Sequence, residues 1–252
     1  MKLFIRSIGV AALIFGCTAL IQAQTSPAAS PATAAAKSGV AGGTNAGRTD
    51  IYHVHVVHAA PGKAAELGES MKQPGPSPAP QHQVVFRHQY GDSWDYVVVG
   101  HYGTKYTLEA VRPQIPPDQR SLSDSHTDTF VNGPSWAEFS RAMGLDDPKK
   151  STGAVYVVSL YRSVPGGREA LEKNLAEPPD PAMDKAAGTA LMQHLEGADW
   201  NFLGIVRYNS WADLATSQTN SVPKTAEKDS GWSKMRESTA THTDTLCDRL
   251  LP

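Results

Sequence analysis

The nine histidines of this 252-residue chain are the side chains best suited to proton transfer or ligand binding, and all lie between His53 and His242. A neutral imidazole can accept a proton, donate one or bind a metal, and it titrates near neutral pH. His88 and His194 occur in matching sequence contexts, as do His126 and His242. We predict that His88 with His126, and His194 with His242, line two related ligand sites. The alternative is that these histidines are buried polar residues that hold the fold together by hydrogen bonds.

His53 and His55 stand two residues apart in an apolar, β-branched run, so in a strand both would face one side. Such a pair can ligate a metal, but spacing fixes no third ligand. The matching positions later in the chain are Val157 and Ser159. We therefore expect the two histidines to lie on a solvated or pocket-lining face and predict no metal site.

Aromatic residues recur in pairs along the chain. The pairs are Trp94 with Trp200, Tyr52 with Tyr156 and Tyr102 with Tyr208. Such rings can stack on a flat organic ligand, and the alternative is that they pack a core or a hairpin. The first two pairs join the four histidines as ligand-pocket candidates.

Asp128 and Asp244 each follow a histidine by two residues. On a helix this spacing turns the two side chains about 200° apart, so no histidine–aspartate relay is expected within a turn. His58 and His82 are expected on the surface.

The common catalytic signatures are missing. The sequence has no Gly-x-Ser-x-Gly elbow, no Gly-x-x-x-x-Gly-Lys loop, no Gly-x-Gly-x-x-Gly and no His-Glu-x-x-His. Their absence argues against the common hydrolases, ATPases and zinc proteases. The cysteines are Cys17 and Cys247, so a chain that loses its first residues has no internal disulfide and no ordinary cysteine-ligated zinc.

The predicted strands and helices that must position these residues occur twice in the chain. The strand-like runs 52–57 and 156–161 each end at a Pro-Gly turn and lead into predicted helices at 64–71 and 169–175. Residues 88–97 then align without a gap with 194–203, sharing histidine, glycine and tryptophan, and this pattern predicts a hairpin in each copy.

A third match lies at the end of each copy, where residues 125–130 correspond to residues 241–246. Apolar residues and histidines at steps of three and four predict a helix at 122–130 and at 232–250. The threonines leave a strand as the alternative. A short extra helix is expected within 133–144, and 146–152 is the expected linker.

This order resembles the dimeric α+β barrel superfamily, which includes antibiotic-biosynthesis mono-oxygenase-like domains. The resemblance covers about residues 51–251 and rests on the β-α-β-β-α order and on the Gly-x-x-Trp hairpin. It implies an α+β fold of two tandem ferredoxin-like units, 50–145 and 153–252, that pair their sheets as an intramolecular pseudo-dimeric barrel. It further implies a pocket between sheet and helices in each unit. Chemistry in the family is diverse, and fold analogy does not choose among its reactions.

The N-terminus has the pattern of a secretory signal. Lys2 and Arg6 precede an apolar stretch at 8–21, too short to span a bilayer comfortably, and a small residue at Ala23 offers a cleavage point. We predict a signal peptide at 1–23, a flexible Ala/Pro/Ser/Gly linker at 24–49 and a periplasmic or secreted protein. A retained anchor and a lipoprotein through Cys17 are the alternatives.

Composition and charge limit the kinds of molecule that this protein is expected to bind. Apolar residues make up 40% and charged residues 19% of the chain, and the formal net charge is −2. This balance gives no basis for binding nucleic acid.

We predict a monomer of unassigned activity that binds a small molecule. The alternatives are a cofactor-independent mono-oxygenase-like enzyme, a haem-associated barrel and a non-catalytic structural or interaction module; no cofactor is predicted, with haem or a metal left open.

Overall fold

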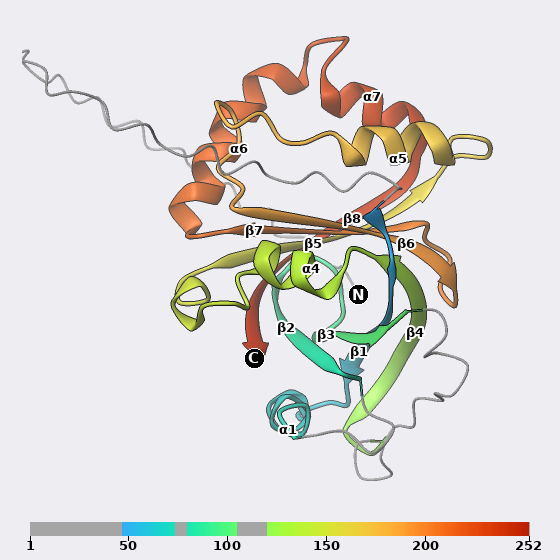
Figure 1. The fold of residues 1–252 in the computed structure, drawn as a ribbon, viewed down its shortest axis with the longest axis vertical. Helices are drawn as coiled ribbons and strands as arrows, with labels where there is room; N and C mark the ends of the chain where they lie inside the picture. Colours follow the sequence, from blue (N-terminus) through green and yellow to red (C-terminus); the bar gives the residue numbers. More distant parts are fainter. Residues whose placement is uncertain (1–46, 74–79, 105–119, 252) are drawn as a thin grey trace, which may run out of the picture. The chain divides into compact units, whose positions relative to one another are not determined.

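The computed structural model describes residues 47–73, 80–104 and 120–251, which form a mixed α+β fold (Figure 1). The strands are β1 (Asp50–Ala59), β2 (His82–Tyr90), β3 (Tyr96–Gly103), β4 (Ser123–Gly133), β5 (Val155–Ser163), β6 (Gly188–Glu196), β7 (Phe202–Tyr208) and β8 (Thr239–Leu251). The α-helices are α1 (Ala64–Ser70), α4 (Trp136–Met143), α5 (Arg168–Ala176), α6 (Trp211–Thr225) and α7 (Gly231–Ser238), with a 3-10 helix η2 (Pro148–Lys150).

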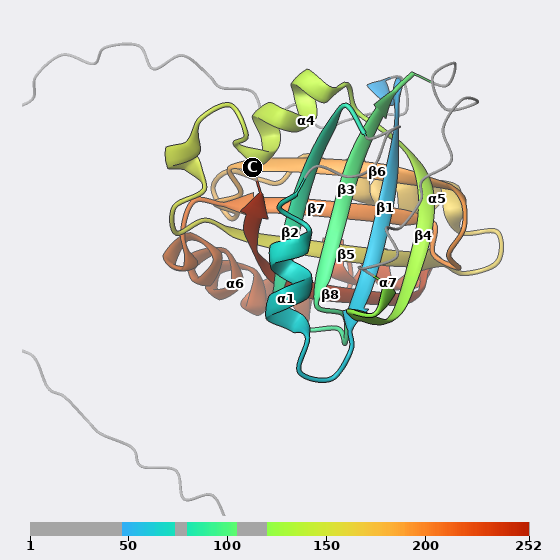
Figure 2. The same ribbon diagram turned by 90° about the horizontal axis from the view of Figure 1, so that it is seen from below.

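The strands close into an antiparallel barrel in the order β1-β3-β2-β8-β5-β7-β6-β4 (Figure 2). Strands β1 to β4, the first half, lie together in the order β4-β1-β3-β2. Strands β5 to β8, the second half, lie together in the matching order β8-β5-β7-β6. The halves meet at two seams, where β2 pairs with β8 and β4 pairs with β6.

Alternation along the strands divides the barrel wall into an inner and an outer face. On β1, Tyr52 and Val54 point into the central cluster and are fully buried, together with Phe86 of β2. Burying each large apolar side chain contributes about 1.5–3 kcal/mol. His53 and His55 alternate with these residues and therefore lie on the outer face.

The helices cover the outer face. Helix α1 packs Leu67 against Val57 and Tyr96 of the first half. In the second half, Leu214 of α6 packs against Tyr208 of β7, and α5, α6 and α7 lie on one side of the β5–β8 wall (Figure 1).

Several sequence predictions are confirmed locally. Helices α1 and α5 begin after the predicted Pro-Gly turns, both hairpins form, and α4 lies within 133–144. The predicted linker 146–152 contains η2. Helix α6 was not predicted. The predicted signal peptide and most of the predicted linker at 24–49 lie outside the described residues.

The prediction of a helix at the end of each copy, at 122–130 and at 232–250, is wrong. Residues 123–133 form strand β4, and only 231–238 of the second segment is helical before strand β8 begins at Thr239. The spacing of three and four suited a helix, but β4 pairs with β1 and β6, and β8 pairs with β5 and β2. Backbone pairing on both edges outweighs the local pattern, and the threonines favour an extended chain.

The repeated hairpin glycines lie at the seams. Gly91 has φ +128° and Gly197 has φ +117°, a region that favours glycine. A Cβ on Gly91 would overlap the carbonyl oxygen of Asp244, and a Cβ on Gly197 would overlap that of Asp128. Each hairpin therefore packs directly on the last strand of the opposite half.

Helix α4 spans one end of the barrel and ties the halves together. At its N-terminus the Trp136 amide donates to Asp50 at 3.0 Å. At its C-terminus the Met143 carbonyl accepts from the Tyr156 hydroxyl at 3.0 Å and from Arg249 at 3.3 Å. A carboxylate at the N-terminus and a guanidinium at the C-terminus both complement the helix dipole.

Within the ranges given above, no helix is long and apolar enough to cross a membrane.

Candidate functional site

Three histidines surround one carboxylate on the outer face of the first half. His55 Nδ1 lies 2.7 Å and His53 Nε2 lies 3.0 Å from the same Asp128 oxygen, and His126 Nε2 lies 3.4 Å from the other. Strand β1 supplies His53 and His55, and β4 supplies the other two residues. His55 and Asp128 are direct cross-strand partners, so the antiparallel register itself brings them together. We call these four residues the histidine cluster.

The carboxylate of the histidine cluster is held in its charged form. Burial alone would raise the pKa of Asp128, but hydrogen bonds from His53 and His55, with their nearby positive charge, lower that pKa well below its ordinary value. An ionised carboxylate only accepts, so the His55 Nδ1 must carry the proton of their shared hydrogen bond. Nε2 of a neutral His55 is then left as a proton acceptor.

Aromatic rings border the histidine cluster. The His53 ring lies 5.1 Å from Phe130 and 6.3 Å from Tyr102, measured between centroids. Tyr102 is almost fully buried, and burial together with the charge of Asp128 raises its pKa, so the phenol stays protonated. These rings pack beside His53, whose own ring lies 6.3 Å from that of His55.

The second half carries a different set of residues at the same register. Ser159 replaces His55 and donates its hydroxyl to Asp244 at 2.6 Å. His242 Nε2 lies 3.1 Å from the other oxygen of Asp244, and the His242 ring stacks on Tyr161 at 5.3 Å. A cavity of about 180 Å³ opens beside Ser159 and Tyr161.

The expected separation of His126 from Asp128, and of His242 from Asp244, is wrong for a geometric reason. Both segments are strands, where side chains two residues apart share a face. Each histidine therefore contacts the aspartate that follows it.

His88 and His194 do not lie with the histidines predicted to accompany them. His88 on β2 and His126 on β4 are separated by β3 and β1, a distance of about 14 Å at the usual strand spacing. His194 on β6 and His242 on β8 are separated in the same way by β7 and β5. His88 and His194 each lie instead at a seam, directly across from Cys247 and Val131 respectively.

The tryptophan candidates lie against these seam histidines. The His88 ring is 5.9 Å from Trp94, and the His194 ring is 5.6 Å from Trp200. Both tryptophans belong to the central cluster. Burial and the charge of Arg168 lower the pKa of His194. Nε2 of both histidines is buried and has no hydrogen-bond partner among the described residues.

Tyr52 and Tyr156 are core residues. Both are fully buried, and their hydroxyls donate to backbone carbonyls, that of Tyr52 to Pro134 at 2.7 Å and that of Tyr156 to Met143. These bonds anchor both ends of α4 and satisfy the phenols inside the barrel.

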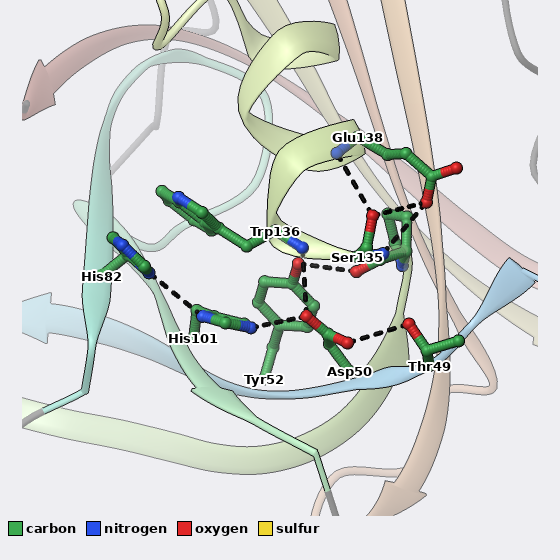
Figure 3. Close-up of polar contacts among 9 residues, drawn as sticks. Thr49, Asp50, Tyr52, His82, His101, Ser135, Trp136 and Glu138 are labelled. Atoms are coloured by element: carbon green, nitrogen blue, oxygen red, sulfur yellow. Dashed lines mark hydrogen bonds and ion pairs between the residues drawn. The ribbon is translucent and has the colours of Figure 1, made fainter.

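A further polar chain at the barrel end was missed by sequence reasoning (Figure 3). His82 Nδ1 lies 3.2 Å from His101 Nδ1, and His101 Nε2 lies 2.7 Å from Asp50. His82 is exposed, as expected, and stacks on Trp136 at 4.3 Å. Side chains alternate along β3, so the buried Val97 and Val99 could have indicated that His101 also points inward. Its partners, His82 and Asp50, lie on other strands and could not be found in this way.

In the described part of the chain, no group of three or more histidine, cysteine or acidic residues has the geometry to hold a metal ion. In the histidine cluster, one carboxylate contacts three imidazoles and orients them.

Known structures share this architecture. The structure of an anthrone oxidase-like protein aligns with a TM-score of 0.55 and 13% identity over 80% of this chain and 91% of that chain. A provisionally assigned monooxygenase from Lactobacillus acidophilus NCFM aligns with a TM-score of 0.51 and 8% identity over 80% of this chain and 94% of that chain. No protein family and no curated protein matches the sequence. Identities this low show a shared fold alone.

Proposed function

We propose that this protein is an exported, monomeric, small-molecule-binding barrel built by tandem duplication of a ferredoxin-like unit. Supporting this proposal, the halves repeat the same strand order and place equivalent glycines at equivalent seams. The outer face of each half carries an aspartate with a histidine two residues before it. An internal pair of sheets would satisfy within one chain the surface that related barrels bury as dimers.

We further propose that the first half removes a proton from an enolisable or phenolic aromatic compound. The observation that carries this proposal is the His55–Asp128 contact of 2.7 Å. Asp128 fixes the tautomer of His55, leaves Nε2 to accept the substrate proton, and stabilises the imidazolium that forms. Phe130, which is half-buried beside His53, would border the substrate ring. Positioned general-base catalysis of this kind typically contributes about 10²–10⁴-fold in rate.

The reaction that follows most directly is oxygenation without a cofactor. After loss of its proton, an anthrone-type ring methylene is an electron-rich carbanion that can transfer electrons to O2. The carbon then gains one oxygen atom as a ketone, and the second oxygen leaves as water with the two former methylene hydrogens. One anthrone and one O2 thus give one anthraquinone and one water. The anthrone oxidase-like neighbour suggests this substrate class for the test, although its 13% identity supports the fold alone.

The proposed reaction needs no haem, because the carbanion itself transfers electrons to O2.

The test is oxygen uptake with anthrone, together with chromatographic detection of anthraquinone. We expect the full chain to accelerate both, and His55→Asn to abolish the acceleration. The matched control is His58→Asn, which alters an exposed histidine on the same strand and should keep the activity. Equal rates for the wild type and His55→Asn would remove the proposed base.

A further inference from the structure

The second half contains a cavity in its outer wall. It lies against β5, β6 and β7, beneath the C-terminal end of α5 and the segment 177–184. Its volume of about 180 Å³ equals that of about six liquid waters at ~30 Å³ each. This space suits a small organic molecule.

A pair of small residues opens this cavity. Ser159 and Gly204 are cross-strand partners on β5 and β7. The corresponding pair in the first half, also cross-strand partners, is His55 and Val98. A Cβ added to Gly204 would lie 3.4 Å from Tyr161 and 3.8 Å from the Ser159 Cβ, which are ordinary contact distances. The position therefore has room for a side chain that this sequence does not supply.

The charged residues lining the cavity are all acidic. They are Glu177 and Asp184, and no lysine, arginine or histidine is among the described residues that line it. Asp244 lies across from Ser159 on β8 and accepts a hydrogen bond from its hydroxyl at 2.6 Å. Burial and the charge of Asp244 raise the pKa of Tyr161 to about 12, so this lining phenol stays neutral. The electrostatic field inside the cavity therefore favours a cation.

Apart from Thr189, the rest of the lining is apolar. Leu175, Pro178 and Pro179 form one side, and Leu191 and Val206 form the other. A ligand that satisfies both parts needs a compact hydrocarbon group and a positively charged hydrogen-bond donor.

We propose that the second half binds a small aryl- or alkylammonium ion, with its hydrocarbon between the leucines and prolines and its ammonium toward Glu177 and Asp184. This inference rests on the proposed binding of small molecules at the outer faces, but not on the base chemistry of the first half. The halves have then diverged, one toward proton transfer and the other toward recognition of a cation.

Calorimetry and NMR on the full chain can test this assignment with benzylamine, its neutral counterpart benzyl alcohol and its anionic counterpart benzoate. We expect benzylamine to bind with one site per chain, benzyl alcohol to bind about tenfold more weakly, and benzoate not to bind. Binding of benzylamine should weaken with salt. Equal binding of amine and alcohol, or no binding of the amine at millimolar concentration, would overturn the proposal.

Substitutions of the residues that line the cavity test where the amine binds. Gly204→Val places the first half's residue in the cavity and should abolish benzylamine binding, with the milder Gly204→Ala as a second variant if the valine disturbs folding. Glu177→Gln with Asp184→Asn should weaken binding about tenfold, whereas Glu169→Gln, an exposed change on α5, should not. Unchanged affinity in Gly204→Val would place the amine elsewhere.

His55→Asn separates this proposal from the preceding one. It should abolish oxygen uptake and leave benzylamine affinity unchanged. Lack of oxygen uptake in the wild type, with intact amine binding, would contradict only the base chemistry.

Discussion

His55 lies directly across from Asp128 in the β1–β4 pair, and its Nδ1 is 2.7 Å from the carboxylate. The second half conserves the aspartate as Asp244 but places Ser159 opposite it at 2.6 Å. At the position opposite the aspartate, the same backbone register thus carries an imidazole in one half and a hydroxyl in the other. Because the register is identical, side-chain identity alone accounts for this difference.

Asp128→Asn should lower kcat for anthrone oxidation by about 10²–10⁴-fold with a small change in KM. The amide would no longer fix the His55 tautomer or stabilise the imidazolium. Steady-state oxygen uptake measures both constants, and the exposed change Asp124→Asn on the same strand is the control. A change confined to KM would argue for substrate contact rather than support of a base.

Acid should destabilise the protein partly through Asp128. Its folded pKa is depressed below 3.8, so the unfolded state binds more protons in that window. The stabilising contribution is fully present above about pH 4 and is lost as the pH falls through the folded pKa. Between about pH 5 and 2, the free energy of unfolding measured with urea should fall less steeply with decreasing pH in Asp128→Asn than in the wild type. Equal slopes in the two proteins would show that the contact contributes no pH-dependent stability.

His82 should titrate below the ordinary value of 6.5. Burial and the nearby charge of His101 lower its pKa, so the folded state disfavours protonation. Its contribution to stability is therefore present above pH 6.5 and is lost as the pH falls through the folded pKa. NMR titration of the ring protons measures this directly, and His101→Asn should move the midpoint of His82 upward. An unchanged midpoint in that variant would remove His101 as a cause.

Gly197→Ala should destabilise the barrel by more than the roughly 1–3 kcal/mol expected for a strained backbone alone. The new Cβ would meet the Asp128 carbonyl across the seam. Gly166→Ala is the matched control, because Gly166 also has a positive φ of 76° but open space around it. Denaturant unfolding of both variants isolates the steric part, and equal losses would show that the seam can adjust.

Asp50→Ala should cost about 1–3 kcal/mol, because it leaves the buried His101 ring and the Trp136 amide without their shared acceptor. Hydrogen exchange of the Trp136 amide, followed by NMR, should report loosening of the α4 N-terminus before global unfolding. Asp124→Ala, at an exposed position, controls for loss of charge. Equal stability of the two variants would mean that water replaces the carboxylate.

Much of the local structure could be predicted from the sequence. The Pro-Gly turns at 61–62 and 165–166 precede α1 and α5, and the repeated histidine-glycine-tryptophan pattern marks both hairpins. Alternation along residues 51–59 placed His53 and His55 together on one face. These predictions succeed because turn residues and strand periodicity act over a few neighbouring residues.

The candidate site could be predicted only in part. His126 and His242 were selected, but their partners were assigned wrongly, and Asp50 and His101 were overlooked. His126 meets His55 because β4 pairs with β1, which lies about 70 residues earlier in the chain. Spacing within one segment carries no information about such a partner.

The sequence by itself therefore determined the paired elements, their turns and the alternation of side chains along each strand. Only the tertiary structure decided that 123–133 and 239–251 are strands and which face of the wall each histidine occupies. The physical reason is that the threonines favour an extended chain only weakly, while the spacing of the apolar residues also suits a helix. Its conformation is fixed by hydrogen bonds to strands on both sides, and those strands are distant in the sequence.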